Sequence, residues 1–280
     1  MSRNKLLTRE KRKSPLAVLQ YKERIRTKSR RVTPAMKPFE DHPFYKNLMK
    51  YAVVPLWKEN QKAKQAGREI ENLEGSLMYH FRVFEYAGSL YEGLKRLHDI
   101  PLFMQRGFSL SWMDKMNLAP QEWFVYNYSN YRVVATGIFD TTLLVANDVL
   151  DIKIEPRNIN RKFLNRPEIK ENGLFVSLEK IDQTVEQFRK ERNKYVHRST
   201  RPEIDFVDNL YAYHLLREAK EKGYYKGDLP TPKKANAYYN EERDKKTSEI
   251  TAETEKIFSA VIEFLDALSP VYLRKIKELS

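Results

Sequence analysis

The chain has 280 residues, of which 41% are hydrophobic and 32% charged, and it contains no cysteine. This composition allows one or two domains with a buried core, and it excludes disulfides, zinc fingers and thiol catalysis. No apolar run approaches the roughly 18–20 residues of a membrane span, and the N-terminus lacks the hydrophobic segment of a secretory signal. We therefore expect a soluble protein without membrane contact, and the absence of cysteine fits a reducing cytoplasm.

Positive charge is concentrated at the N-terminus. Residues 1–40 hold 13 Lys and Arg against three Glu, which is +10 of the total formal charge of +13. Such a segment repels itself, buries little surface and attracts polyanions through counterion release. We predict a flexible or extended basic arm over residues 1–40 and a single domain over residues 41–280. The arm is interpreted either as a nucleic-acid contact or as a solvated tail that can dock on an acidic partner.

Helical spacing dominates the first half of the domain. A short helix is expected around residues 43–65, and apolar residues recur at steps of three and four over residues 73–91, as on one face of a helix. Residues 100–119 contain Pro and Gly and are expected to form a long connection. Residues 121–152 are apolar on all sides and are predicted to be the central buried helix. Their β-branched residues would also fit a strand, but a length of about thirty residues without a turn signal favours a helix.

The second half continues the helical pattern. A basic, turn-rich loop is expected over residues 153–173, followed by an amphipathic helix that starts near Ser177. A further helix is predicted over residues 203–222, then a Tyr- and Lys-rich loop, and a last helix from about Ser248 with a kink at Pro270. The fold class is therefore all-α, a bundle of about six helices behind the basic arm.

The helix that starts near Ser177 ends in the stretch "QFRKERNKYVHRSTRP". Its apolar stripe continues past Phe188 to Arg192 and Tyr195, so a guanidinium occupies a position that periodicity assigns to the packed face. A half-buried Arg needs a carboxylate, a carbonyl or a bound anion as partner. The spacing therefore singles out Arg192 as a residue with a specific partner.

The central helix offers two candidate partners for this arginine. Asp140 and Asn147 are seven residues apart and therefore lie on one face of that helix. Asp140 could equally cap a helix or pair with Arg132. Both residues are treated as supporting members of the site, together with Tyr195.

His197 lies five residues after Arg192, which is about 140° around an ideal helix. Two arrangements would bring the pair together. The helix could end or loosen between them, as Pro202 and the polar residues before it would allow. Alternatively, two copies of the helix end could face each other across a two-fold axis.

The segment "RNKYVH", from Arg192 to His197, resembles the R-x4-H signature of the HEPN superfamily, in which a polar residue such as Asn193 usually follows the arginine. The resemblance covers about residues 120–280 and leaves the helices of residues 43–98 as additions. It implies a helical bundle that dimerises so that both motifs form one cleft. It also implies a metal-independent endoribonuclease without a cofactor, of the kind found in toxin–antitoxin pairs and phage defence.

The resemblance also implies roles for three residues. His197 would act in proton transfer while the RNA 2′-hydroxyl attacks the adjacent phosphate, and a 2′,3′-cyclic phosphate would be the product. Arg192 would bind the phosphate and Asn193 would orient its neighbours. The residue types suit this chemistry, because a histidine with a pKa near 6.5 exchanges protons readily and a planar guanidinium matches phosphate oxygens. Some antitoxin-paired members carry a tyrosine where this chain has Ser199, so no subgroup is assigned.

A plain basic helix terminus remains the competing interpretation, since cations are favoured at helix C-termini. Arg189, Lys194, Arg198 and Arg201 are the further candidates for nucleic-acid contact. The expected partners are RNA, a second copy of the chain and, on the resemblance, an antitoxin or another regulator. The alternative function is a non-catalytic helical module that binds nucleic acid or protein, and a third is a scaffold whose arm binds an acidic protein.

Two other groups of residues are assigned by their surroundings. The remaining histidines lack metal-ligand spacing. His42 is interpreted as a helix-start residue, and the other three are interpreted as structural residues, namely His80, His98 and His214. Two tyrosine pairs, at residues 224–225 and 238–239, stand beside lysines in the expected loop. They could stack nucleobases, or they could anchor the loop to the bundle.

Overall fold

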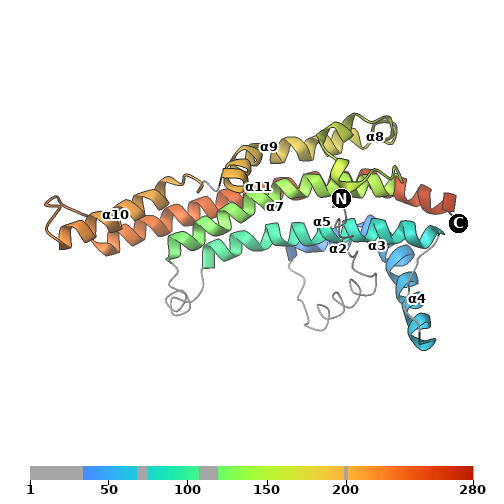
Figure 1. Ribbon diagram of the computed structural model, residues 1–280, viewed down its shortest axis with the longest axis horizontal. Coiled ribbons are helices and arrows are strands. Elements are labelled where there is room, and N and C mark those ends of the chain that lie inside the picture. The colour runs from blue at the N-terminus through green and yellow to red at the C-terminus, as the bar shows by residue number, and fades with distance from the viewer. Residues whose placement is uncertain (1–33, 68–74, 107–118, 199–200, 280) are drawn as a thin grey trace, which may run out of the picture.

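The computed structural model describes residues 34–67, 75–106, 119–198 and 201–279, and for residues 106, 197 and 198 the backbone alone. No strand occurs among these residues, which confirms the all-α class. The helices of twelve residues or more in this part of the chain are α4 (Val54–Gln65), α5 (Gly75–Arg106), α7 (Pro120–Val149), α9 (Phe175–Arg198), α10 (Asp205–Glu221) and α11 (Pro232–Leu279) (Figure 1). None of the helices in the described part is long and apolar enough to cross a membrane.

Helices α5, α7, α9 and α11 form a four-helix bundle. Each packs against two neighbours, in the order α5, α7, α9, α11 and back to α5. The predicted central helix is confirmed as α7, whose Phe124, Tyr131 and Phe139 are among the largest fully buried side chains. The ring of Phe188 on α9 meets Tyr131 edge-on at 5.7 Å between centroids. Apolar burial along these stripes is the main force that holds the four helices together.

The N-terminal segment is more ordered than the charge pattern indicated. The turn η1 (Pro34–Met36) and helix α2 (Lys37–Glu40) bury Met36 and Phe39, and the Phe39 ring lies 5.1 Å from that of Phe258 on α11. The predicted arm therefore extended too far, because two large apolar side chains within it pack on the bundle. Residues 1–33 of that arm lie outside the described residues.

A second short segment follows, made of α3 (Pro43–Leu48) and the π-helical turn η2 (Met49–Val53). His42 caps α3, since its Nδ1 accepts a hydrogen bond of 3.1 Å from the backbone N–H of Phe44. This confirms the interpretation of His42 as a helix-start residue. His80 is also structural, because it is buried with its Nδ1 3.0 Å from the Tyr272 hydroxyl.

The connection expected over residues 100–119 begins later than predicted. Helix α5 continues through Pro101 to Arg106, and Ile100 and Met104 are buried in register with Leu97. Burial of these side chains outweighs the loss of one backbone hydrogen bond at the proline. The remainder of that stretch, residues 107–118, lies outside the described residues.

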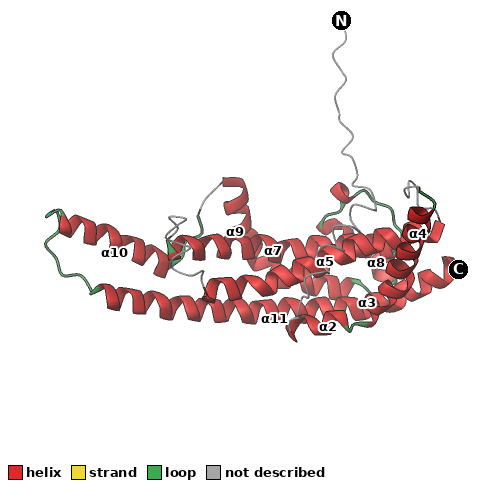
Figure 2. Cartoon of the chain, turned by 90° about the horizontal axis from the view of Figure 1, so that it is seen from below, coloured by secondary structure: helices red, strands yellow, loops and turns green. Residues whose placement is uncertain are grey.

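The last helix begins sixteen residues earlier than predicted, at Pro232 instead of Ser248. Proline is well suited to the first turn of a helix, where its missing N–H costs nothing. Tyr239 then fixes this segment, since its hydroxyl donates to the Pro120 carbonyl at 3.2 Å and its ring lies 5.6 Å from Phe206. As a result, α10 and the first part of α11 form a helical hairpin that extends beyond the bundle (Figures 1 and 2).

Between α7 and α9 the chain makes the turns η3 (Pro156–Asn158) and η4 (Arg161–Asn165) and the short helix α8 (Pro167–Glu171). The predicted turn-rich loop is thus confirmed, with short helical turns inside it. Its path returns the chain to the bundle so that α9 runs antiparallel to α7, which places the end of α9 beside the middle of α7.

Candidate active site at the end of helix α9

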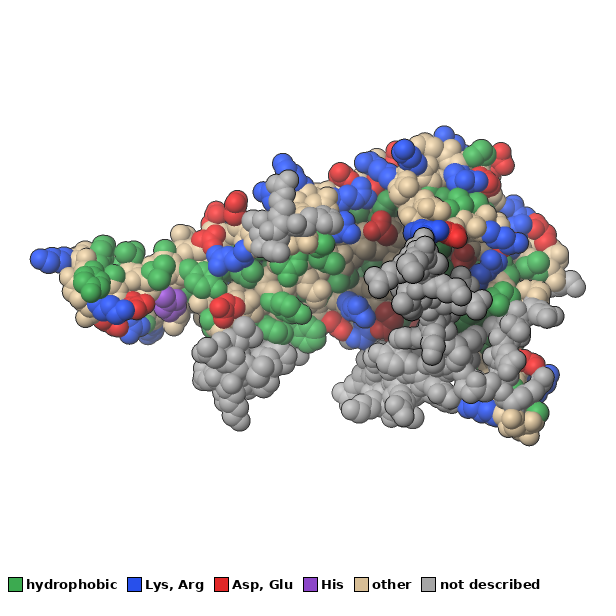
Figure 3. Space-filling view, in the orientation of Figure 1, with side chains coloured by type: hydrophobic (Ala, Val, Ile, Leu, Met, Phe, Trp, Pro, Cys, Tyr) green, Lys and Arg blue, Asp and Glu red, His purple; other side chains and the backbone are tan. Residues whose placement is uncertain are grey.

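The R-N-x-x-x-H segment occupies the last turns of α9. Phe188 is the last fully buried residue of this helix, and from Lys190 to Val196 every side chain except Arg192 is exposed. Figure 2 shows that the final part of α9 turns away from the bundle. In the space-filling view, basic side chains border this end of α9 and acidic side chains lie beside them (Figure 3). The motif is therefore presented on a projecting helix end with a single half-buried member.

One of the two expected arrangements required α9 to end or loosen between Arg192 and His197, and the helix does not end there. It continues to Arg198, so the two positions remain about 140° apart around the helix. Side chains on a helix also lean toward its N-terminus, which directs Arg192 back toward the bundle. The side chains of His197 and Arg198 themselves lie outside the described residues.

Arg192 lies within electrostatic reach of Asp140, which α7 presents toward the end of α9. Loss of hydration raises the pKa of the Asp140 carboxyl, while the guanidinium groups of Arg192 and Arg189 lower it and Asp182 raises it. The predicted neighbourhood of Asp140 and Arg192 is thus present. Asp140 does not pair with Arg132, which has other partners.

The guanidinium of Arg192 is incompletely satisfied. Its Nη1 donates to the Oδ1 of Asn193 at 3.2 Å. Its Nε–H is buried and has no hydrogen-bond acceptor among the described residues. A buried donor without a partner costs free energy, and one more acceptor, such as a phosphate oxygen, would remove that cost.

A network of ion pairs lies one turn before the motif. Asp182, only 1% exposed, receives Arg189 on one oxygen, and the Nε of Arg161 lies 2.7 Å from the other. Arg189 also pairs with Glu186 and lies 5.0 Å above the Phe139 ring. Arg189 was predicted to contact nucleic acid, but the structure commits it to contacts within the chain. The sequence offered one signal for this network, a carboxylate directly after Ile181 in an apolar stripe.

Arg132 is a buried arginine of α7 that lies under Glu191, the residue before the motif arginine. It is 6% exposed and its guanidinium carbon lies 4.5 Å from the Tyr128 ring and 4.3 Å from the Phe188 ring. Its Nη2 donates to the Tyr128 hydroxyl. From the sequence, Arg132 was only a possible partner of Asp140, and this cluster was not predicted.

Two carboxylates balance this guanidinium. The Nε of Arg132 is 3.1 Å from an oxygen of Glu191, and Nη1 is 3.6 Å from an oxygen of Glu253. These are ion pairs without hydrogen-bond alignment, since neither the Nε–H of Arg132 nor the Glu253 oxygen has a hydrogen-bond partner in the described ranges of the chain. Arg132 thereby links α7 to α11 and to the turn of α9 that carries Arg192.

Glu253 makes the stability of this cluster dependent on pH. Burial raises its pKa above the ordinary 4.5, against the opposing charges of Arg132 and Lys246, and Glu249 and Glu191 add to the rise. A carboxyl whose pKa is higher in the folded state binds protons more tightly there. The stability it contributes is therefore lost as the pH rises from 4.5 through the folded pKa.

Replacing Glu253 by glutamine is expected to remove this part of the pH dependence. The free energy of unfolding, measured by urea denaturation from pH 4 to pH 8, should fall less steeply with pH in Glu253→Gln than in the parent protein. Glu255→Gln is the matched control, because Glu255 is exposed on the same helix. Identical slopes for the parent and Glu253→Gln would contradict the raised pKa.

The other predicted site residues fall into two groups. Asn147 does not join the site, because its amide donates to the Asp148 carboxylate at 3.0 Å and exchanges hydrogen bonds with the backbone of Ile154. Asn147 thus stabilises the turn after α7. It lies on the same face of α7 as Asp140, but two helical turns further along, which is too far from Arg192 to join the site. Tyr195 and Lys194 are exposed near the motif.

Arg201 lies after the motif and is held by the next helix. It pairs with Asp208, and its guanidinium carbon lies 4.5 Å from the Tyr211 ring. Among the described residues, no three His, Asp or Glu side chains come close enough together to hold a metal ion.

A comparison with known protein families agrees with the resemblance to the HEPN superfamily. A family model described as Cthe2314-like HEPN matches residues 63–265. No curated protein and no solved structure gives a significant match. The matched region begins near the end of α4 and includes α5, α7, α9, α10 and most of α11.

Proposed function

The chain belongs to the Cthe2314-like HEPN family, and on this premise we propose that it is a metal-independent endoribonuclease. The active site would consist of Arg192, Asn193 and His197 at the ends of two α9 helices, one from each copy of a homodimer. The setting we propose is a toxin or a phage-defence system. RNA is the substrate because the reaction uses the ribose 2′-hydroxyl as its nucleophile.

The observation that carries this proposal is the buried Nε–H of Arg192 without an acceptor among the described residues. An arginine fork binds two phosphate oxygens at once, and within the described part of the chain the guanidinium of Arg192 donates only to the Asn193 side chain. The Asp140 carboxylate and this guanidinium lie within electrostatic reach of each other, so their opposite charges attract. An RNA phosphate would supply the acceptor that the Nε–H of Arg192 does not find among the described residues.

The continuation of α9 supports a site shared between two copies. Positions 192 and 197 lie about 140° apart on one helix, so a single copy cannot present both on the same face. The end of α9 projects from the bundle (Figure 2), which leaves it open to a second copy. In a two-fold arrangement, the histidine of one copy can face the arginine of the other.

The proposed reaction needs only protein groups. The histidine of one copy accepts the proton of the 2′-hydroxyl as this oxygen attacks the adjacent phosphorus. The bond from phosphorus to the 5′-oxygen breaks, and the same histidine, now protonated, donates its proton to the leaving oxygen. Arg192 binds the charge that builds up on the phosphate. The products are a 2′,3′-cyclic phosphate and a 5′-hydroxyl.

Mixing two inactive variants tests both the chemistry and the shared site. Arg192→Ala and His197→Ala are unfolded and refolded together in equal amounts, and cleavage of single-stranded RNA is measured in EDTA. Suppose that each of the two sites in a dimer takes its arginine from one copy and its histidine from the other. Half of the dimers in the mixture then contain one copy of each variant, and each of these has one complete site and one inactive site. The mixture should then recover about a quarter of the parent activity.

Each possible result of this experiment has a clear meaning. A mixture as inactive as either variant would place both groups in one chain and overturn the shared site. RNA with 2′-O-methyl groups is the substrate control, since it lacks the nucleophile and should remain uncut. Salt-sensitive binding without cleavage by the parent protein would favour the non-catalytic module instead.

A further inference from the structure

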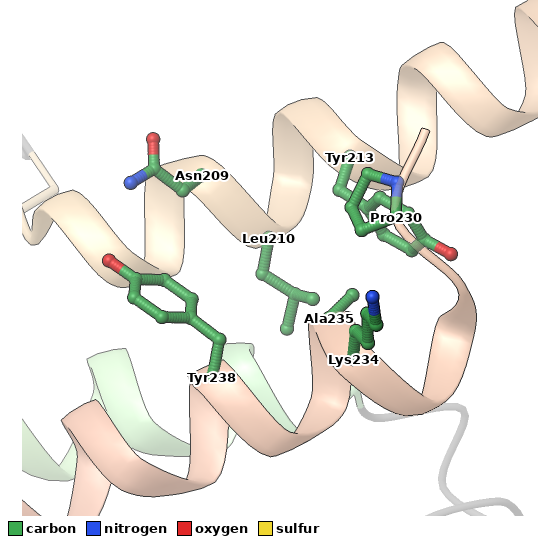
Figure 4. Close-up of a pocket in the computed structure, with 7 residues that line it drawn as sticks. All are labelled: Asn209, Leu210, Tyr213, Pro230, Lys234, Ala235 and Tyr238. Atoms are coloured by element: carbon green, nitrogen blue, oxygen red, sulfur yellow. The ribbon is translucent and has the colours of Figure 1, made fainter. Parts of the chain in front are cut away.

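The hairpin of α10 and α11 contains a groove outside the motif region. It encloses about 320 Å³ and is lined by Asn209, Leu210, Tyr213, Pro230, Lys234, Ala235 and Tyr238. This volume lies at the lower end of the range for small-molecule sites. Figure 4 shows the Tyr238 ring opposite Asn209 and Leu210, with Tyr213 and Lys234 at the other end beside Pro230. The floor is apolar and its rim carries an amide, two phenols and an ammonium group.

The polar groups of this groove have no partners in the described part of the chain. Neither the Asn209 amide nor the hydroxyls of Tyr213 and Tyr238 has a hydrogen-bonding partner there. The ammonium of Lys234 has no carboxylate partner in the same residues. The recess itself is apolar, and Tyr238 and Lys234 place an aromatic ring and an ammonium group along it.

The two tyrosines of the pair at 238–239 have separate roles. Tyr239 is buried and anchors α11, through its hydrogen bond to Pro120 and its contact with Phe206. Tyr238 is 46% exposed and lines the groove. The sequence allowed this pair either to anchor its segment or to stack on bases. Tyr239 is the anchor, and Tyr238 has an exposed ring that is suited to stacking.

We infer that this groove binds one nucleotide of a single-stranded RNA. The base would stack on Tyr238 with its edge toward Asn209, and Lys234 would contact a neighbouring phosphate. Stacking on an exposed aromatic ring beside a cation is the common way in which proteins hold unpaired bases. The groove is lined by a lysine and no carboxylate, which favours a nucleotide over a peptide with positive charge. The inference rests on the proposed function for the identity of the ligand as RNA.

The position of the groove suits an RNA that also reaches the motif. Helix α10 starts seven residues after the last residue of α9, a separation of at most about 25 Å for extended chain. Asn209 lies one turn into α10, about 6 Å further. A short single strand bound at the end of α9 could therefore extend along the hairpin past Arg201, whose guanidinium lies over the Tyr211 ring.

Binding of a 2′-O-methyl RNA tests the groove without interference from cleavage. A fluorescein-labelled single-stranded 12-mer is titrated with each protein and the dissociation constant is measured by anisotropy. Tyr238→Ala should weaken binding by about 5- to 100-fold, while Tyr238→Phe, which keeps the ring, should stay within about twofold. Lys234→Gln should lower the slope of log affinity against log salt by about 0.7.

Tyr224→Ala is the matched control, because Tyr224 is 84% exposed on the same hairpin but does not line the groove. If Tyr238→Ala and Tyr224→Ala both bind like the parent protein, the groove is not an RNA site and a protein ligand becomes the better explanation. Cleavage by the parent would still uphold the proposed function in that case. Conversely, weak binding by Tyr238→Ala together with an inactive parent would uphold the groove and refute the nuclease.

Discussion

Alanine at Arg192 or at His197 is expected to lower the rate of RNA cleavage by about 100- to 10,000-fold. Removal of a general acid or base costs about this much, and loss of a charged donor to the transition state costs a similar amount. Arg192 is half-buried near the surface and His197 lies in the last turn of α9. The Arg192 side chain is not part of the core, so we expect its replacement to cost activity and not folding.

Two further variants separate chemistry from charge. Arg192→Lys retains the positive charge but loses the planar fork, so it should recover only part of the activity. Lys190→Ala removes an exposed cation two residues earlier on the same helix and should change the rate by less than about threefold. Initial rates on labelled RNA in EDTA, with circular dichroism to check folding, measure both. If Lys190→Ala loses as much as Arg192→Ala, the segment is an unspecific basic surface.

Alanine at Arg132 is expected to give the largest loss of stability, about 3 kcal/mol. Removing one member of a buried ion pair leaves its partners without compensation and costs about 3–5 kcal/mol. The lower end applies here because Glu191 is half exposed and remains hydrated. The substitution also removes the contacts of the guanidinium with the rings of Tyr128 and Phe188. Urea denaturation followed by far-ultraviolet circular dichroism measures the loss.

The same variant should show a dependence on pH with a defined sign. Without Arg132, the pKa of Glu253 rises further, since Arg132 is the main group that lowers it. Protonation of Glu253 in mild acid then relieves the variant more than the parent, so the stability deficit should shrink as the pH falls. Arg157→Ala is the control, because Arg157 pairs with Glu155 in full solvent and should cost less than about 0.5 kcal/mol. A deficit that stays constant with pH would mean that packing alone accounts for the loss.

Arg132 connects stability to the candidate site. Its partner Glu191 directly precedes Arg192, so the ion pair fixes the turn of α9 from which the motif arginine extends. The cluster with Glu253 lies under this turn and ties it to α11. If Arg132→Ala also lowers cleavage, the effect should be smaller than that of Arg192→Ala, because Arg132 acts through the position of α9 and not on the substrate.

Periodicity located the long helices well. The central helix, the motif helix and the helix after it were predicted to within a few residues of α7, α9 and α10. Each has an apolar stripe or an apolar surface that only burial in a bundle can satisfy, and this signal is local to the sequence. The prominence of Arg192 came from the same source, as a cation in an apolar stripe.

Periodicity failed where a local signal was outweighed by a distant contact. Pro101 and the polar stretch after Pro232 resembled breaks, yet both lie inside helices because Met104 is buried and Tyr239 is anchored to Pro120. Phe39 in the basic arm packs on Phe258, more than two hundred residues away. Such contacts depend on which helices become neighbours, and no short window of sequence contains that information.

The sequence by itself determined the all-α class, the helix that carries the R-N-x-x-x-H segment and the family to which that segment points. Spacing along one helix is sufficient for these conclusions, because the 3.6-residue period is a property of the chain alone. Only the tertiary structure decided which charges meet. It placed Asp140 near Arg192 and bonded the Asn147 amide to Ile154 in the turn after α7. It also paired Arg189 with Asp182 and buried Arg132 under Glu191. The pairs of Asp140 with Arg192 and of Arg132 with Glu191 join α7 to α9, so packing across the bundle sets these partners.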